Sequence, residues 1–227
     1  MAATYVSGAT VATAGNYTPA SGTNTCMLLI GGGYNSGGDT CSGQTYNSIS
    51  MTERQDITLD TGGTRDPCYQ IADLVNPGTS SQAIATTWAA GLTLEEYFCV
   101  TLDGVDQTTP VYPTNGNVSA TFGVDTAPSL TYDAPDNSTI IYFKFLRTAT
   151  PDFTLPTGFT QVYAKAFQVN TEVRIWQKDQ ATAVTSATVS STSTAAQGGV
   201  HGVIVYQPAA AAGGFQAAWA RFANRLI

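Results

Sequence analysis

Residues 161–169 read Gln-Val-Tyr-Ala-Lys-Ala-Phe-Gln-Val, and residues 173–177 continue in the same alternating style. Such period-two patterns are typical of half-buried β-strands. No amphipathic helix pattern occurs before the C-terminal tail, so the body of the chain is predicted to be all-β. In the first stretch one face would carry Val162, Ala164, Ala166 and Gln168, and the other Tyr163, Lys165, Phe167 and Val169.

Short strand-like stretches recur along the chain, and turn signals such as Asn76-Pro77-Gly78, Asn115-Gly116 and Pro156-Thr157-Gly158 separate them. Many short strands at fairly regular spacing predict an antiparallel β-sandwich (jelly roll). We expect strands at Thr25–Tyr34, Gln44–Met51, Glu53–Leu59, Cys68–Val75, Gln82–Trp88, Tyr97–Leu102, Asn117–Val124, Thr139–Leu146, Thr160–Val169, Glu172–Gln177, Ala183–Ser190 and Gly199–Tyr206.

Three zones of the chain differ in character. Residues 1–24 are small and polar, and we expect them to form an extended N-terminal arm. Residues 25–207 hold the strand-like stretches and form the β-sandwich domain. Residues 208–227 begin with a proline and a glycine-rich hinge and form a short C-terminal docking tail. This tail has two of the nine basic residues and no acidic one, so its charge is +2; the remaining seven basic and 16 acidic residues make the rest −9.

The tail has the pattern of an amphipathic helix, with large apolar residues at intervals of 4, 3 and 4. A helix of about a dozen residues is marginal alone in water. We therefore expect it to order only on its own acidic body, on a sister subunit or on another protein. A tryptophan flanked by arginine is typical of binding interfaces. The predicted interface residues are Phe215, Trp219, Arg221, Phe222, Arg225 and Leu226.

The composition argues against several classes of protein. The 227 residues carry a net charge of −7, whereas nucleic-acid binding relies mainly on Lys and Arg. The longest strictly aliphatic run, Met27–Ile30, is far below the roughly 20 residues that span a bilayer. No basic residue precedes Arg54 and no apolar h-region is present, so we expect no signal peptide. The chain has few charged residues, which is typical of an extracellular protein, but no export signal is expected. This combination favours a virion protein, which is made in the host cytoplasm and exposed when the host lyses.

The four cysteines lack the spacing of a metal site. Cys26, Cys41, Cys68 and Cys99 form no CxxC pair, so no metal is expected. Cys26 and Cys99 lie in apolar runs, where a free thiol behaves as a small buried hydrophobe. Cys41 and Cys68 lie near loops and are the better disulfide candidates. Four cysteines allow three complete pairings, and all three stay open, as does a bridge between subunits.

Groups suited to catalysis are sparse. His201 is the only histidine, and its place within a strand-like run favours a structural role. Glu95 and Glu96 are neighbours in a strand and would point to opposite faces, which is poor geometry for a catalytic pair. Asp103 and Asp106 bracket a glycine and are expected to cap a turn. We predict no catalytic residue, no cofactor and no enzymatic activity.

Three motifs resemble those of a known family. Thr25-Cys-Met-Leu-Leu-Ile-Gly-Gly-Gly-Tyr34 resembles the opening strand of jelly-roll, concanavalin-like sandwiches of bacterial surface and phage structural proteins, and Gln44-Thr-Tyr-Asn-Ser-Ile-Ser-Met-Thr52 resembles their next hairpin. Phe98-Cys-Val-Thr-Leu-Asp-Gly-Val-Asp-Gln-Thr-Thr-Pro-Val111 is similar to a third stretch, the most specific of the three. The tail segment Gly214–Arg221 resembles a C-terminal peptide of tailed-phage virion proteins. Cys26 departs from the family's usual Arg.

This resemblance implies a structural component of a tailed bacteriophage virion, above all a capsid decoration or cement protein. It would bind the major capsid protein or other virion proteins by its termini and form a homo-oligomer, either a dimer or a trimer. A collar, tail or fibre component is an alternative, as is a glycosidase or lyase of the same fold. Another is a carbohydrate-binding module that holds a glycan on loop-adjacent tyrosines, namely Tyr34, Tyr46, Tyr69, Tyr112 and Tyr132.

Overall fold

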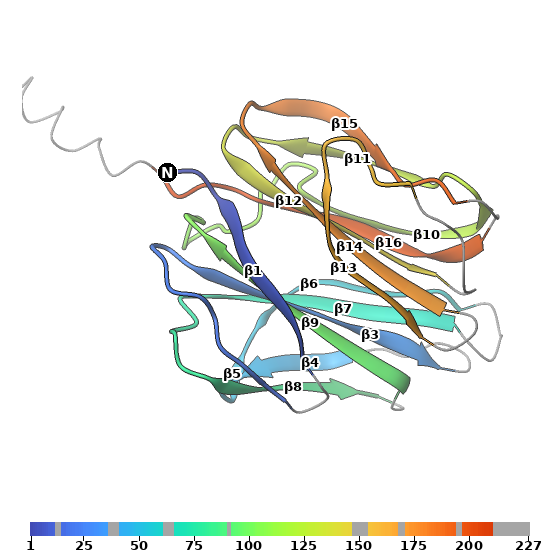
Figure 1. The fold of residues 1–227 in the computed structure, drawn as a ribbon, viewed down its shortest axis with the longest axis horizontal. Helices are drawn as coiled ribbons and strands as arrows, with labels where there is room; N and C mark the ends of the chain where they lie inside the picture. Colours follow the sequence, from blue (N-terminus) through green and yellow to red (C-terminus); the bar gives the residue numbers. More distant parts are fainter. Residues whose placement is uncertain are drawn as a thin grey trace, which may run out of the picture.

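The computed structural model describes residues 1–11, 15–35, 41–60, 66–89, 92–146, 154–167, 171–193 and 197–210, which form sixteen strands and no helix (Figure 1). Within these ranges no helix is therefore available to cross a membrane. The strands are β1 (Thr4–Val11), β2 (Asn16–Tyr17), β3 (Cys26–Asn35), β4 (Cys41–Tyr46), β5 (Ile49–Ser50), β6 (Thr52–Thr58), β7 (Asp66–Val75), β8 (Gln82–Trp88), β9 (Thr93–Asp103), β10 (Asn117–Asp125), β11 (Ser129–Ala134), β12 (Ser138–Leu146), β13 (Thr160–Phe167), β14 (Thr171–Gln180), β15 (Val184–Ser190) and β16 (Gln197–Tyr206).

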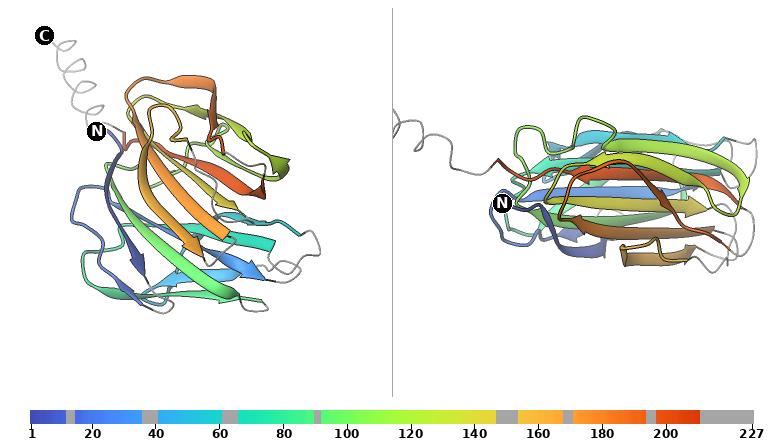
Figure 2. Two further views of the ribbon diagram at one scale, coloured as in Figure 1. Left: turned by 45° about the vertical axis from the view of Figure 1, so that its right-hand side comes forward. Right: turned by 90° about the horizontal axis from the view of Figure 1, so that it is seen from above.

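The strands are arranged in four layers, which Figures 1 and 2 show stacked on one another. An outer sheet has the order β2-β8-β4-β5, and it covers a first central sheet with the order β1-β9-β3-β7-β6. A second central sheet, β10-β16-β12-β14-β13, packs on the first, and an outer ribbon of β11 and β15 covers it. Neighbouring strands are antiparallel throughout these sheets. The predicted all-β, antiparallel β-sandwich is confirmed, whereas the jelly-roll assignment stays a prediction.

Each interface between layers has its own hydrophobic core. The main core lies between the two central sheets and contains Leu28, Ile71 and Phe143. A second core, around Met27 and Tyr46, joins the first central sheet to the outer sheet. A third joins the second central sheet to the outer ribbon, and its members are Leu130, Tyr132, Ala134, Ile140, Tyr142, Phe159, Trp176, Val189, Val203 and Val205.

The central strands are buried on both faces because a layer covers each side. Every residue of β12 is buried, and so are the first eight residues of β7. This arrangement explains why the sequence of β12, Ser138–Leu146, is almost continuously apolar rather than alternating. The close approach of the layers also explains Gly32, where a Cβ atom would lie 2.6 Å from the ring of Phe145. The half-buried strands that alternation predicts are therefore only part of the molecule, and the central strands are buried on both faces.

Residues 1–24 contribute two strands to this body. β1 is an edge strand of the first central sheet and pairs with β9 from Thr4 to Val11. Ala3, Val11 and Tyr17 are buried, and the Tyr17 hydroxyl lies 2.8 Å from Oγ1 of Thr101. Small and polar residues suit an edge strand because one of its sides faces solvent. The expectation of an extended arm is therefore corrected for the described residues of this segment.

Two polar groups tie the central sheets together from inside. Gln55 of β6 donates from Nε2 to the carbonyl oxygen of Val203 in β16 (3.0 Å), and the Tyr69 hydroxyl donates to its Oε1 (3.1 Å). The Tyr206 hydroxyl of β16 donates to the buried carboxylate of Asp73 in β7 (3.2 Å), which also accepts two hydrogen bonds from Arg54 of its own sheet, at 2.7 and 2.9 Å. These groups satisfy one another, as buried polar side chains must, and they fix the position of β6 against the second central sheet.

Candidate functional site

The loop after β9 is held by two aspartates. Asp103 Oδ1 accepts hydrogen bonds from the amides of Thr23 (2.7 Å) and Gly104 (2.9 Å). Asp106 Oδ1 accepts a hydrogen bond from the amide of Thr108 (2.8 Å). Side-chain oxygens that cap backbone amides in this way stabilise tight turns. The prediction that these two aspartates cap a turn is confirmed.

Both ends of the described chain meet at this loop. The Ala209 amide donates to the carbonyl oxygen of Gly104 (2.7 Å), and Pro208 forms an antiparallel bridge with Val105. A Cβ atom on Gly104 would lie 2.0 Å from the carbonyl oxygen of Ala2. Figure 2 shows the N-terminus at the end of the body where the described chain leaves it. We call this end, formed by residues 1–3, 103–105 and 208–210, the terminal pole.

The predicted docking tail begins at the terminal pole. Residue 210 is the last described residue, so the six predicted interface residues lie outside the described part of the chain. Their role stays a prediction. These residues are Phe215, Trp219, Arg221, Phe222, Arg225 and Leu226.

The four cysteines are free thiols, so the structure contains no disulfide among them. Cys26 lies in the core between the central sheets, whereas Cys99 lies on the opposite face of the first central sheet. Cys41 and Cys68 share one small cluster with Trp88. Burial raises the pKa of the Cys41 thiol to about 11 and that of Cys99 still further. The thiols of Cys41 and Cys99 are therefore protonated at neutral pH. Cys41 and Cys68 are the pair that shares a site.

His201 is buried in the second central sheet, with an exposed fraction of 1%. Its ring packs edge-on against Phe122, and its Nδ1 lies 3.4 Å from the hydroxyl oxygen of Tyr142. Burial, and then the charge of Lys144, lower the pKa of the imidazole to about 4. The ring is therefore neutral at physiological pH and fills a core position, in line with its expected structural role.

The carboxylates that the sequence offered as pairs serve separate structural roles. Glu95 accepts a hydrogen bond from the Tyr97 hydroxyl (2.7 Å). Glu96 accepts one from the Tyr163 hydroxyl (2.7 Å) and forms an ion pair with Lys165. The two glutamates therefore have different partners, as expected for neighbours in a strand. Across the described ranges, no group of three or more His, Cys, Asp or Glu residues is placed to hold a metal ion.

The tyrosines predicted as possible sugar platforms are mostly core residues. Tyr34, Tyr46, Tyr69 and Tyr132 are buried, and only Tyr112 is half-exposed. Each buried ring packs in one of the cores between the layers. A stacking platform needs an exposed ring face, so this version of the carbohydrate-binding hypothesis is wrong for four of the five tyrosines. Position next to a loop does not distinguish a core tyrosine from an exposed one.

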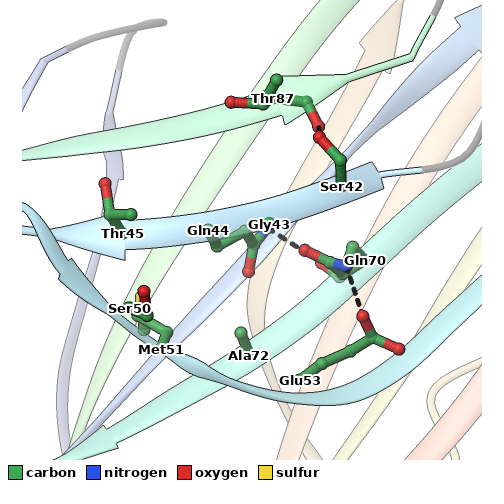
Figure 3. A pocket seen from close by; sticks show the side chains of 10 residues that line it. All are labelled: Ser42, Gly43, Gln44, Thr45, Ser50, Met51, Glu53, Gln70, Ala72 and Thr87. Atoms are coloured by element: carbon green, nitrogen blue, oxygen red, sulfur yellow. Dashed lines mark hydrogen bonds between the residues drawn. The ribbon is translucent and has the colours of Figure 1, made fainter.

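A polar pocket of about 380 Å³ opens between the outer sheet and the first central sheet (Figure 3). Gln44 reaches it from β4, and Gln70 and Glu53 reach it from the facing strands β7 and β6. No sequence motif indicates this site, because its residues come from five separate strands. Its wall is formed by Ser42, Gly43, Gln44, Thr45, Ser50, Met51, Glu53, Gln70, Ala72 and Thr87.

The polar groups of this pocket leave acceptors unused. Gln44 Nε2 donates to the carbonyl oxygen of Gln70 (3.3 Å), and Gln70 Nε2 donates to Glu53 Oε2 (2.9 Å). Each amide nitrogen thus donates a hydrogen bond, but Oε1 of Gln44 and Oε1 of Gln70 have no hydrogen-bond partner. The two side chains are almost fully buried, with exposed fractions of 2% and 1%. Unpaired buried acceptors are costly, and a bound molecule or ordered water would satisfy them.

The terminal pole and the polar pocket are thus two distinct candidate sites. Comparisons with protein-family models, with curated proteins and with solved structures found no match to this chain. Function must therefore be inferred from the fold and from the chemistry of these two sites.

Proposed function

We propose that this protein is a structural component of a tailed bacteriophage virion, specifically a capsid decoration or cement protein that attaches to the head by its termini. The observation that carries the proposal is the terminal pole. Because Ala2 and Ala209 both pack on Gly104, the first and the last described residues lie at the same end of the body. Segments that extend from one end can bind a surface while the rest of the body stands away from it.

The layered body suits a passive structural role. Three cores separate four layers, so the central strands are shielded from solvent on both faces. The hydrogen bonds from Gln55 to Val203 and from Tyr206 to Asp73 hold the two central sheets against each other. Apolar burial is the main stabilising term in folding, and each of the three cores contributes to it.

Attachment would depend on the docking tail. Its apolar residues would form one face of a helix that packs on the major capsid protein or another virion protein. Arg221 and Arg225 give the tail its positive charge and would pair with acidic groups on that partner. Each contact is small, but a dimer or trimer on a symmetric shell would bind through several tails at once. Such multivalency can raise the overall affinity by about 10²–10⁴-fold.

A truncation tests this proposal. We would delete residues 213–227 and measure the number of copies on gradient-purified particles by quantitative mass spectrometry. The deletion is expected to abolish attachment and to leave the thermal unfolding of the body unchanged. A full-length chain with Trp219→Ser and Phe222→Ser is the matched control for length, and it is also expected to detach. Full occupancy of the truncated chain would show that the tail is not the anchor.

The position on the particle separates the head proposal from a collar, tail or fibre component. Antibodies against the folded body, bound to intact particles and viewed by electron microscopy, would label the whole head surface for a decoration protein. Label confined to the neck or tail would replace the head assignment with one of the other virion roles.

A further inference from the structure

We propose that the pocket formed by β4, β5, β6, β7 and β8 is a binding site for a neutral sugar, which donates hydroxyl hydrogen bonds to Gln44, Gln70 and Glu53. The inference does not depend on the virion role. It rests on the shape of the pocket and on its unpaired acceptors. It also differs from the tyrosine-platform hypothesis, since no aromatic residue is among the ten that line the pocket.

The volume fits a small ligand. Sites for small molecules are typically concave and about 300–1,000 Å³ in volume, and this pocket is about 380 Å³. Met51 and Ala72 supply an apolar patch on the wall, and the remaining eight residues are polar or glycine. A sugar ring has the same mixture, with apolar C–H groups and a rim of hydroxyls.

The acceptors set the chemistry of the ligand. In Figure 3 the side chains of Gln44 and Gln70 extend from facing strands into the space between them, and Glu53 lies beside Gln70. An amide oxygen and a carboxylate can only accept hydrogen bonds, so the group that satisfies them must donate. Solvent does not reach either Oε1 atom, so a ligand hydroxyl would need a small rotation of each amide to reach it. The vicinal hydroxyls of a sugar supply several such donors on adjacent carbon atoms.

The charge of the pocket selects against other ligands. Glu53 is the one charged residue on the wall, and none of the ten lining residues is Lys, Arg or His. An acidic sugar or a phosphate would therefore meet repulsion without a compensating cation. Ca²⁺ usually takes six to eight oxygen ligands, commonly with several carboxylates, whereas this wall offers a single carboxylate. A neutral sugar is the ligand that these groups fit best.

Unpaired amide oxygens also occur elsewhere in the described chain, at Gln107, Gln177 and Gln180. None of these three lines the pocket. What distinguishes Gln44 and Gln70 is that both side chains line one pocket and that a carboxylate, Glu53, lines it with them. The remote glutamines are therefore useful as controls.

The test is a titration of the ¹⁵N-labelled full-length chain, followed by two-dimensional NMR. The neutral probes are methyl α-D-glucopyranoside, methyl β-D-galactopyranoside and N-acetyl-D-glucosamine, each at millimolar concentrations. Sodium D-glucuronate and calcium chloride are the anionic and cationic probes. We expect saturable shifts for at least one neutral sugar, centred on the amides of β4 and β7. Glucuronate should bind at least tenfold more weakly than the neutral sugars, because its carboxylate would be repelled by that of Glu53.

Substitutions test whether the NMR shifts caused by sugar depend on the acceptor groups of the pocket. Gln44→Met keeps the length of the side chain but removes the unpaired oxygen and the hydrogen bond from Nε2 to the Gln70 carbonyl, so it is expected to weaken sugar binding about tenfold while the chain stays folded. Gln180→Met is the matched control, since it removes an equally unpaired and buried oxygen outside the pocket; it should leave binding unchanged. Glu53→Gln at an exposed position is a second variant that should fold and should weaken binding severalfold.

Several results would overturn the inference. The first is the absence of saturable shifts with all three neutral sugars, which would mean that only water fills the pocket. The second is a response to calcium chloride alone, which would make this a cation site. Sugar shifts that centre elsewhere, or that persist in both Gln44→Met and Glu53→Gln, would also refute it.

Discussion

The amide nitrogen of Ala209 lies 2.7 Å from the carbonyl oxygen of Gly104, and this hydrogen bond fixes the last described residues of the chain beside the first. The carbonyl of Ala2 packs against the other side of the same glycine. One residue in the loop after β9 thus contacts both the first and the last described residues at the terminal pole.

Gly104 is expected to tolerate no side chain. Its φ of +70° favours glycine, and a Cβ atom would meet the backbone of Ala2 at 2.0 Å. Gly104→Ala should therefore lower the free energy of unfolding by about 2 kcal/mol or more, measured by urea denaturation. Gly78→Ala is the control, because Gly78 has a similar φ of +77° but open space around its Cβ position. Equal losses in the two variants would mean that the contact with Ala2 does not matter.

The buried ion pair should be sensitive to the loss of one partner. Arg54→Met leaves the carboxylate of Asp73 without its bidentate donor, although Tyr206 still donates to it at 3.2 Å. An uncompensated buried charge costs about 3 kcal/mol, and thermal or urea unfolding would report this loss. The double variant Arg54→Met with Asp73→Leu removes both charges and should recover most of the stability. If it were as unstable as the single variant, lost packing and not charge would be the cause.

His201 gives the protein a defined acid sensitivity. It is the one histidine of the chain, so its imidazole resonances in ¹H NMR report its pKa without ambiguity. We expect a midpoint near pH 4, against about 6.5 in the unfolded chain. Between these values the unfolded state binds more protons, so stability falls as the pH is lowered, by up to about 1.4 kcal/mol per pH unit. His201→Gln should lack this component. A midpoint at or above 6.5 would contradict the buried, neutral imidazole.

Oxidation should select one cysteine pair. Diamide, which accepts the two electrons and two protons released by a pair of thiols, is expected to produce a disulfide between Cys41 and Cys68, because these two share a cluster with Trp88. Cys26 and Cys99 lie on opposite faces of the first central sheet and should stay reduced. Peptide mapping by mass spectrometry would identify the bridge. Cys68→Ser should eliminate it and Cys99→Ser should not; a bridge that includes Cys26 would refute the assignment.

The sequence predicted the fold class because local patterns are sufficient for it. Alternation in residues 173–177 and turn signals such as Asn76-Pro77-Gly78 indicate strands and breaks without knowledge of partners. The capping roles of Asp103 and Asp106 were also predictable, since each caps an amide within a few residues.

The features that could not be predicted from the sequence depend on contacts between residues that are distant along the chain. The outer sheet joins β2, β8, β4 and β5, and no local pattern indicates that this sheet covers another. The polar pocket has the same origin, because Gln44 and Gln70 are far apart along the chain and meet only when the layers pack. The tyrosines were misjudged for the same reason: Tyr46 and Tyr69 lie close to loops but face the neighbouring layers.

The most direct measurement is a cryo-EM map of the particles with which the protein copurifies. We expect the four-layered body on the surface of a phage head, in a symmetric arrangement, with Gly104 and the terminal pole turned toward the shell. A body bound through its opposite end would contradict attachment by the termini. Recovery of the protein only as free single chains, with none on particles, would contradict the virion role altogether.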